Sequence, residues 1–307
     1  MNEKPSGLAL FFIGASLCFM TPVEAMEPTL VSDGLAIYVR GQGRPVLLFP
    51  YPHGSTTEPM ADSVLADIFV GLGRTVITFD PPGAYRSSRR PDADMAEMLA
   101  CAVEALELWG GAGLSPVVVD VAGHSMGGLC AIAFAVEHRE QTGKLLLLNT
   151  TSGFSAVRRW GIHRHWSVFE REFWEIRYLG TRIMLGRASA RHHDRLTYLN
   201  DSVSYHDSRH IPAAPAAPGN RDPMPVRDAW LSEVREVEFK DRLSEVKAEA
   251  LITVGTWDPQ TPPAMARELH EGIPSSMLVE FEYSGHAPFV EERELFTEVL
   301  ARFLRDS

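Results

Sequence analysis

One serine lies in a short glycine-rich segment that could expose it for chemistry. Residues 123–128 have the sequence Gly-His-Ser-Met-Gly-Gly and follow the β-branched run at residues 117–119. Glycines two positions before and after Ser125 permit a turn that is too tight for a Cβ atom at either place. The pattern predicts that Gly123 and Gly127 hold the Ser125 hydroxyl out at the end of a strand, where it could act as a nucleophile.

A serine nucleophile needs a base at neutral pH, and the base needs a third group that fixes its tautomer. Asp258 follows an apolar run at residues 251–254, and His286 follows another at residues 278–283. Taken alone, Asp258 could cap the next helix and His286 could be an ordinary loop histidine. Because each comes directly after a predicted strand, we expect both to meet Ser125 at one edge of a parallel sheet.

Acyl transfer also requires hydrogen-bond donors for the oxyanion that forms in the transition state. The backbone N–H of Met126 is one candidate, and the helix that begins there adds its positive end. His53, Gly54 and Ser55 follow another apolar run, and the N–H of Gly54 or Ser55 is predicted to be the second donor. An ordinary glycine turn is the alternative for this segment. The His53 side chain either contacts substrate or only braces the loop.

These residues need a sheet that brings the ends of distant strands together. From about Leu30 the sequence alternates short apolar runs with amphipathic stretches, a pattern typical of parallel strands covered by helices on both faces. A hairpin is expected at residues 31–40, and further strands at residues 45–49, 75–79, 116–121, 145–148, 250–254 and 278–283. Helices are expected near residues 60–72, 95–108, 128–138, 262–269 and 291–304. The predicted fold class is α/β with a mostly parallel central sheet.

Residues 152–240 interrupt this alternation and are predicted to form a helical lid inserted into a core made of residues 26–151 and 241–307. Helical patches are expected near residues 167–185 and 228–235. Five prolines between residues 211 and 225 exclude a helix interior there and favour an extended loop.

Four aromatic side chains form a stripe in this insertion: Trp166, Phe169, Phe173 and Trp174. The stripe either packs between lid and sheet or lines a pocket. We expect Trp166 and Phe173 to be substrate contacts in the second case.

The composition and net charge of the chain argue against some classes of binding partner. The 307 residues are 45% hydrophobic and 22% charged, which is ordinary for a globular protein. A net charge of −11 without a basic run argues against nucleic acid and acidic membrane surfaces as partners. The three cysteines lack metal-ligand or disulfide-framework spacing, so we expect buried free thiols and no metal site.

The first 25 residues contain a 13-residue apolar run at residues 8–20, preceded by Lys4 and followed by Val23-Glu24-Ala25. This run is too short to span a bilayer. One interpretation is a signal peptide cleaved after Ala25, which would make the protein periplasmic or secreted. The other is an extension upstream of a true start at Met26.

Together these features resemble the α/β-hydrolase superfamily, and the resemblance covers nearly all of residues 30–307 outside the lid. It is carried by the His53-Gly54 loop, residues 79–87, the turn at Ser125, and the segments 255–263 and 284–292. The last two segments are most similar to the prolyl iminopeptidase-like branch. That branch typically has His-Gly-Gly-Pro-Gly where this sequence has Pro-His-Gly-Ser-Thr at residues 52–56, so its substrate does not transfer directly.

The resemblance implies a cofactor-independent serine hydrolase for a small ester, amide or short peptide, with Ser125, His286 and Asp258 as its triad. A prolyl aminopeptidase would also need lid carboxylates to bind the substrate ammonium. Glu170, Glu172 and Glu175 are candidates, with Glu172 preferred; a solvated, salt-bridged helix face is the alternative. Two other functions stay open, because a fold does not dictate a reaction: lyase or perhydrolase chemistry, and ligand binding on a hydrolase scaffold.

Overall fold

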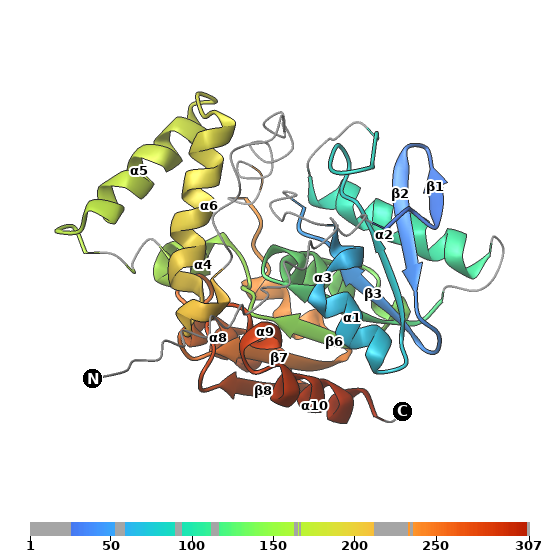
Figure 1. Ribbon diagram of the computed structural model, residues 1–307. Coiled ribbons are helices and arrows are strands. Elements are labelled where there is room, and N and C mark those ends of the chain that lie inside the picture. Colours follow the sequence, from blue (N-terminus) through green and yellow to red (C-terminus); the bar gives the residue numbers. More distant parts are fainter. Residues whose placement is uncertain are drawn as a thin grey trace, which may run out of the picture.

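The central element of the fold is an eight-stranded sheet with the order β1-β2-β4-β3-β5-β6-β7-β8 (Figure 1). The computed structural model describes residues 26–52, 59–89, 94–111, 117–162, 165, 167–211, 233 and 236–305. The strands are β1 (Leu30–Ser32), β2 (Leu35–Arg40), β3 (Pro45–Phe49), β4 (Thr75–Phe79), β5 (Val119–His124), β6 (Thr142–Leu148), β7 (Glu249–Gly255) and β8 (Ser276–Phe281). Strands β3 to β8 pair in parallel, whereas β2 is antiparallel to both β1 and β4. The predicted fold class is confirmed.

The predicted opening hairpin is present as β1 and β2. Asp33 (φ 44°) and Gly34 (φ 74°) both adopt the left-handed conformation that a two-residue hairpin turn requires. The predicted strand at residues 116–121 is shifted, since β5 begins at Val119 and continues to His124. The strand therefore ends immediately before Ser125.

Helices cover both faces of the sheet because its strands are apolar on both sides. Side chains such as Leu47 and Phe49 pack with α2 (Met95–Gly110), α3 (Met126–Glu137) and α8 (Pro263–Gly272) on one face. The alternate residues, Val46 and Leu48, pack with α1 (Val64–Gly71) and α10 (Arg293–Leu304) on the other. The remaining short helices of the core are η1 (Met60–Asp62), η2 (Arg139–Gln141), η5 (Lys240–Glu245) and α9 (Pro288–Glu291).

The helix predicted over residues 60–72 is divided into η1 and α1. Ser63 lies between them with an extended backbone (ψ 155°), and its hydroxyl accepts a hydrogen bond from Ala66 N–H at 3.2 Å. The same hydroxyl donates to Met60 O at 2.7 Å. Ser63 thus caps α1 and ends η1, which breaks the continuous helix that the apolar periodicity predicts.

The chain between β6 and β7 contains α4 (Phe154–Trp160), α5 (Arg171–Met184), α6 (Ala190–Ser204) and η4 (Ser208–His210). Helices α5 and α6 stand beside each other, with α5 on the outer side of α6 and away from the sheet (Figure 1). Helix α5 lies in the patch expected at residues 167–185, whereas α6 was not anticipated because its sequence contains few strongly apolar residues. The patch expected at residues 228–235 lies almost wholly outside the described residues, as do residues 1–25.

No helix in the described ranges is both long and apolar enough to cross a membrane. Cys101 and Cys130 are buried free thiols, as expected, and burial raises the pKa of Cys101 to about 11 and that of Cys130 to about 12. Cys18 falls in the part of the chain that is not described.

Candidate active site

Ser125 occupies the turn between β5 and α3, where the predicted strand-to-helix transition is found. Its backbone is strained, with φ 52° and ψ −122°. Ser125 N–H donates to Leu148 O at 3.0 Å, and the Ser125 carbonyl accepts from Thr150 Oγ1 at 2.6 Å. These bonds to the last residue of β6 and to the second residue beyond it hold the turn in a conformation that serine would rarely adopt alone.

The two glycines that flank Ser125 are required by close backbone approach. A Cβ atom on Gly123 would lie 2.2 Å from Gly127 O, and one on Gly127 would lie 2.7 Å from Phe49 O. Neither contact involves a flexible side chain, so the backbone itself would have to shift. The turn can therefore close only with glycine at both positions, as the sequence analysis predicts.

Gly123→Ala is expected to lower the free energy of unfolding by about 3 kcal/mol or more, because its Cβ overlaps backbone atoms on the opposite side of the turn. Thermal denaturation should show this as a fall in Tm of roughly 6–12 °C. Gly180→Ala in α5 is the matched control, since a Cβ there meets nothing within 4 Å. The control should be neutral or slightly stabilising, and equal Tm values for the two variants would contradict the argument.

His286 and Asp258 form the predicted pair at the same edge of the sheet. His286 Nδ1 donates to Asp258 Oδ2 at 2.7 Å, and both residues are buried. Donation through Nδ1 leaves Nε2 unprotonated in the neutral ring, which is the form that can accept a proton. The loops after β7 and β8 therefore hold the His286 ring in one orientation against Asp258.

Asp258 is held ionised by its surroundings. Burial alone raises the pKa of a carboxyl group, but the charge on His286 and hydrogen bonds from His286, Asn149 and Thr261 outweigh it and lower the pKa of Asp258 to about 2. Asp258 Oδ1 accepts from the backbone N–H of Gln260 at 2.8 Å and of Thr261 at 3.0 Å. Asp258 Oδ2 also accepts from Thr261 Oγ1 at 2.7 Å. The carboxylate is thus fixed in one orientation.

Asn149 is part of this site and was missed by the sequence analysis. Its Nδ2 donates to Asp258 Oδ2 at 2.9 Å and to Gly285 O at 3.2 Å, so it joins the two loops. Asn149 adopts φ 45° directly after β6, and asparagine tolerates this conformation better than most residues. Its place after the apolar strand was the only sequence signal available.

His124, which precedes Ser125, is a second residue that was missed. Its Nε2 donates to His286 O at 2.8 Å, and its Nδ1 accepts from the hydroxyl of Tyr51, which follows β3. The rings of His124 and His286 lie 4.6 Å apart between centroids. Burial and the neighbouring His286 lower the pKa of His124 to about 3, so it stays neutral and acts as a brace.

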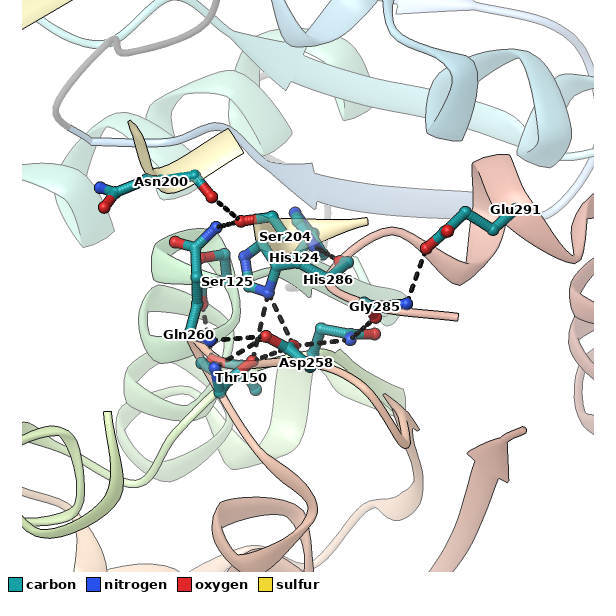
Figure 2. A network of polar contacts seen from close by, with 12 residues as sticks. His124, Ser125, Thr150, Asn200, Ser204, Asp258, Gln260, Gly285, His286 and Glu291 are labelled. Carbon is teal, nitrogen blue, oxygen red and sulfur yellow. Dashed lines mark hydrogen bonds and ion pairs between the residues drawn. The ribbon is translucent and has the colours of Figure 1, made fainter. Parts of the chain in front are cut away.

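Ser125 directly follows His124 in the chain, and the His124 ring lies against that of His286. Figure 2 shows Ser125 within the cluster that contains His124, His286 and Asp258. Within the described part of the chain, neither the Ser125 hydroxyl nor His286 Nε2 has a hydrogen-bond partner. The hydrogen bond between Ser125 Oγ and His286 Nε2 that the predicted triad would use is therefore not among those formed by the described residues.

The other predicted contacts are only partly placed. Met126 begins α3, and as the first residue of that helix its N–H has no intrahelical acceptor. The remaining oxyanion candidates and one predicted lid contact lie outside the described residues: His53, Gly54, Ser55 and Trp166.

The two lid candidates on α5 are not brought to the site. Glu172 and Phe173 lie on α5, which Figure 1 shows outside α6 and away from α3. Phe173 packs against Trp174 with ring centroids 5.2 Å apart. Glu175 forms a two-bond ion pair with Arg195 of α6, at 2.8 and 2.9 Å. For Glu175 the salt-bridged alternative is therefore the observed one.

Residues 46–299 match the family described as the alpha/beta hydrolase family. The chain is 27% identical over 270 residues to a proline iminopeptidase of Clostridioides difficile strain 630, covering 85% of this chain and 89% of that protein. It is 26% identical over 280 residues to a pimeloyl-[acyl-carrier protein] methyl ester esterase of Vibrio cholerae, covering 88% and 98%. An esterase structure from Exiguobacterium antarcticum superposes with a TM-score of 0.64 at 21% identity, covering 92% and 100%.

Proposed function

Because this chain belongs to the alpha/beta hydrolase family, we propose that it is a serine hydrolase that cleaves small ester or amide bonds through an acyl-enzyme. The observation that carries the proposal is the buried pair of His286 and Asp258 next to the strained turn at Ser125. A nucleophile, a base and an orienting carboxylate are then contributed by the ends of three parallel strands. Hydrolytic relatives of two kinds support the proposal.

The proposed reaction begins when Ser125 Oγ attacks the substrate carbonyl carbon and its proton passes to His286 Nε2. Asp258 keeps Nδ1 protonated and stabilises the imidazolium. The oxyanion accepts a hydrogen bond from Met126 N–H, aided by the positive end of α3, and a second from Gly54 or Ser55. His286 then gives its proton to the leaving group. Water next attacks the acyl carbon and passes a proton to His286 Nε2, which returns that proton to Ser125 Oγ as the acid leaves.

As the substrate of the proposed hydrolase, we favour an ester over a peptide with a free amino terminus. An aminopeptidase must bind an ammonium group with carboxylates near the scissile bond. Among the carboxylates predicted for this role, Glu175 is already paired with Arg195, which also lowers the pKa of Glu175, and Glu172 lies on the outer helix α5. The similarity to proline iminopeptidases keeps the aminopeptidase as the second candidate.

Two assays on the purified protein test this function. A fluorophosphonate probe should label Ser125, identified by peptide mass spectrometry, because only an activated serine reacts with it. Hydrolysis of p-nitrophenyl acetate should exceed that of proline p-nitroanilide by well over about tenfold in kcat/KM, because the aryl ester is the more reactive substrate and a missing charge-assisted contact to the proline ammonium is itself worth about tenfold. No labelling of Ser125 would refute the serine hydrolase, and the reverse substrate preference would favour the aminopeptidase.

A further inference from the structure

The last turn of α6 is bonded to both loops that carry the proposed base and its partner. The backbone N–H of His286 donates to the carbonyl of Ser204, the final residue of α6, at 2.6 Å. The Ser204 hydroxyl accepts from Gln260 Nε2 at 2.7 Å and donates to Asn200 O at 2.5 Å. Figure 2 shows this chain of contacts running from Asn200 through Ser204 to Gln260 beside His286. Helix α6 therefore contacts the backbone of the histidine itself.

A second connection passes through Glu291, whose side chain is only 1% exposed. Glu291 Oε2 accepts from Gly285 N–H at 2.6 Å, and Glu291 Oε1 accepts from Asp207 N–H at 2.9 Å. Asp207 follows α6, and Gly285 precedes His286. A buried carboxylate is costly unless it is well bonded, so these two donors account for its position. One carboxylate thus joins the insertion to the histidine loop.

The contact between α6 and the histidine loop leaves no room for a side chain. A Cβ atom on Gly285 would lie 2.1 Å from Ser204 O. Backbone therefore packs directly on backbone, and a shift of Ser204 must displace His286 or break the hydrogen bond between them. Arg195 and Glu175 join α6 to α5, so the two helices are also linked to each other.

We propose that Ser204, Gln260 and Glu291 are positioning residues that make the orientation of His286 depend on helix α6. We call these three residues the α6 latch. This inference rests on the proposed function, in which His286 must bond Asp258 through Nδ1 and present Nε2 to Ser125. The His286 ring can make both contacts only if the backbone of His286 is fixed. A misplacement of about 1 Å costs up to a hundredfold in rate.

Two latch variants, Gln260→Ala and Glu291→Gln, test the proposal with Glu294→Gln as control. Glu294 is an exposed residue of α10. Both latch variants should lower kcat by about tenfold with KM changed less than about twofold. The fall should be equal for p-nitrophenyl acetate and for a longer-chain p-nitrophenyl ester, because the latch acts through His286 and not through the acyl chain. Active sites should be counted by complete fluorophosphonate labelling, so that loss of folded protein does not lower the measured kcat.

Wild-type kcat in both latch variants would overturn the proposal, and so would a change confined to KM or to the longer ester. A Ser125→Ala variant with wild-type activity would instead refute the proposed function. In that case hydrogen exchange of peptides that cover residues 203–211 and 284–287 tests whether the α6 latch couples the helix to the histidine loop. Faster exchange of both peptides in both latch variants supports the coupling, and unchanged exchange in both contradicts it.

Discussion

Replacement of Ser125 by alanine is expected to lower kcat for p-nitrophenyl acetate by about 10⁴- to 10⁶-fold. The variant retains His286, Asp258 and the Met126 N–H, but it has no oxygen that can form the acyl-enzyme. Residual turnover would come from binding and the oxyanion donors alone. The measurement is a steady-state assay on protein freed of contaminating esterases, with Ser155→Ala as control because Ser155 is an exposed serine in α4.

The fold of the Ser125→Ala variant should remain intact. The Ser125 hydroxyl has no partner within the described part of the chain, and the bonds that hold the turn use the backbone of Ser125. Alanine keeps the Cβ atom, so the strain at φ 52° is unchanged. We expect Tm to stay within about 2 °C of the wild-type value, because the hydroxyl contributes less than about 1 kcal/mol. Undiminished turnover in a folded variant would exclude Ser125 as the nucleophile.

The sheet and the sequence position of each candidate residue could be predicted because both depend on local patterns. Parallel strands covered on both faces are nearly continuous apolar runs, and these mark where each strand ends. Asp258 and His286 were predicted because they come shortly after such runs, three residues after β7 and five residues after β8. The turn at Ser125 was found because its two glycines stand where no Cβ fits.

The groups that support these residues could not be predicted, since they are defined by contacts between distant segments. His124 braces His286 through its backbone carbonyl, 162 positions away, and Asn149 reaches Asp258 across 109 positions. Ser204 reaches His286 from a helix whose polar sequence gives only a weak signal. No local periodicity encodes such pairings, so they become visible only when the sheet order is known.

The substrate contacts expected at residues 152–240 were harder to predict for a different reason. Which way the aromatic and charged side chains of a helix face depends on how the neighbouring helices pack, and the sequence does not give that packing. Phe173 packs against its neighbour Trp174, and Arg177 lies over the Phe173 ring at 5.5 Å. Glu175 faces Arg195 of the next helix. Phe173 therefore packs against residues of its own helix, whereas Glu175 joins α5 to α6.

Asp258 is placed so that its replacement by asparagine should force the wrong tautomer on His286. In the variant one carboxylate oxygen becomes an NH₂ group. The Oδ1 position faces two backbone N–H donors, from Gln260 and Thr261, and neither can turn away. The NH₂ group must therefore occupy the Oδ2 position, where Thr261 Oγ1 can rotate to accept. Asn149 can also turn to present its Oδ1, which is buried without a partner among the described residues.

An amide nitrogen accepts no hydrogen bond, so His286 Nδ1 can no longer donate to the group at the Oδ2 position and loses its proton in the neutral ring. The neutral ring consequently carries its proton on Nε2 and cannot take the proton of Ser125. We expect Asp258→Asn to lower kcat by about 10⁴-fold. Asp241→Asn, at an exposed position in η5, is the control. A fall of less than about tenfold would show that Asp258 does not set the tautomer.

Asp258→Asn should also have a lower free energy of unfolding than wild type, because the pKa of Asp258 is lowered in the folded protein. A carboxyl group with a pKa of 3.8 in the unfolded chain and about 2 in the folded protein stabilises the fold above pH 3.8, and this stabilisation is lost as the pH falls through about 2. Wild type should therefore exceed Asp258→Asn by about 2 kcal/mol in unfolding free energy at pH 7, and by about half of that at pH 3. Urea denaturation of both proteins between pH 3 and 7 measures the difference. A difference that does not shrink toward pH 3 would mean that the charge of Asp258 contributes nothing to stability, and the orienting role would then rest on hydrogen-bond geometry alone.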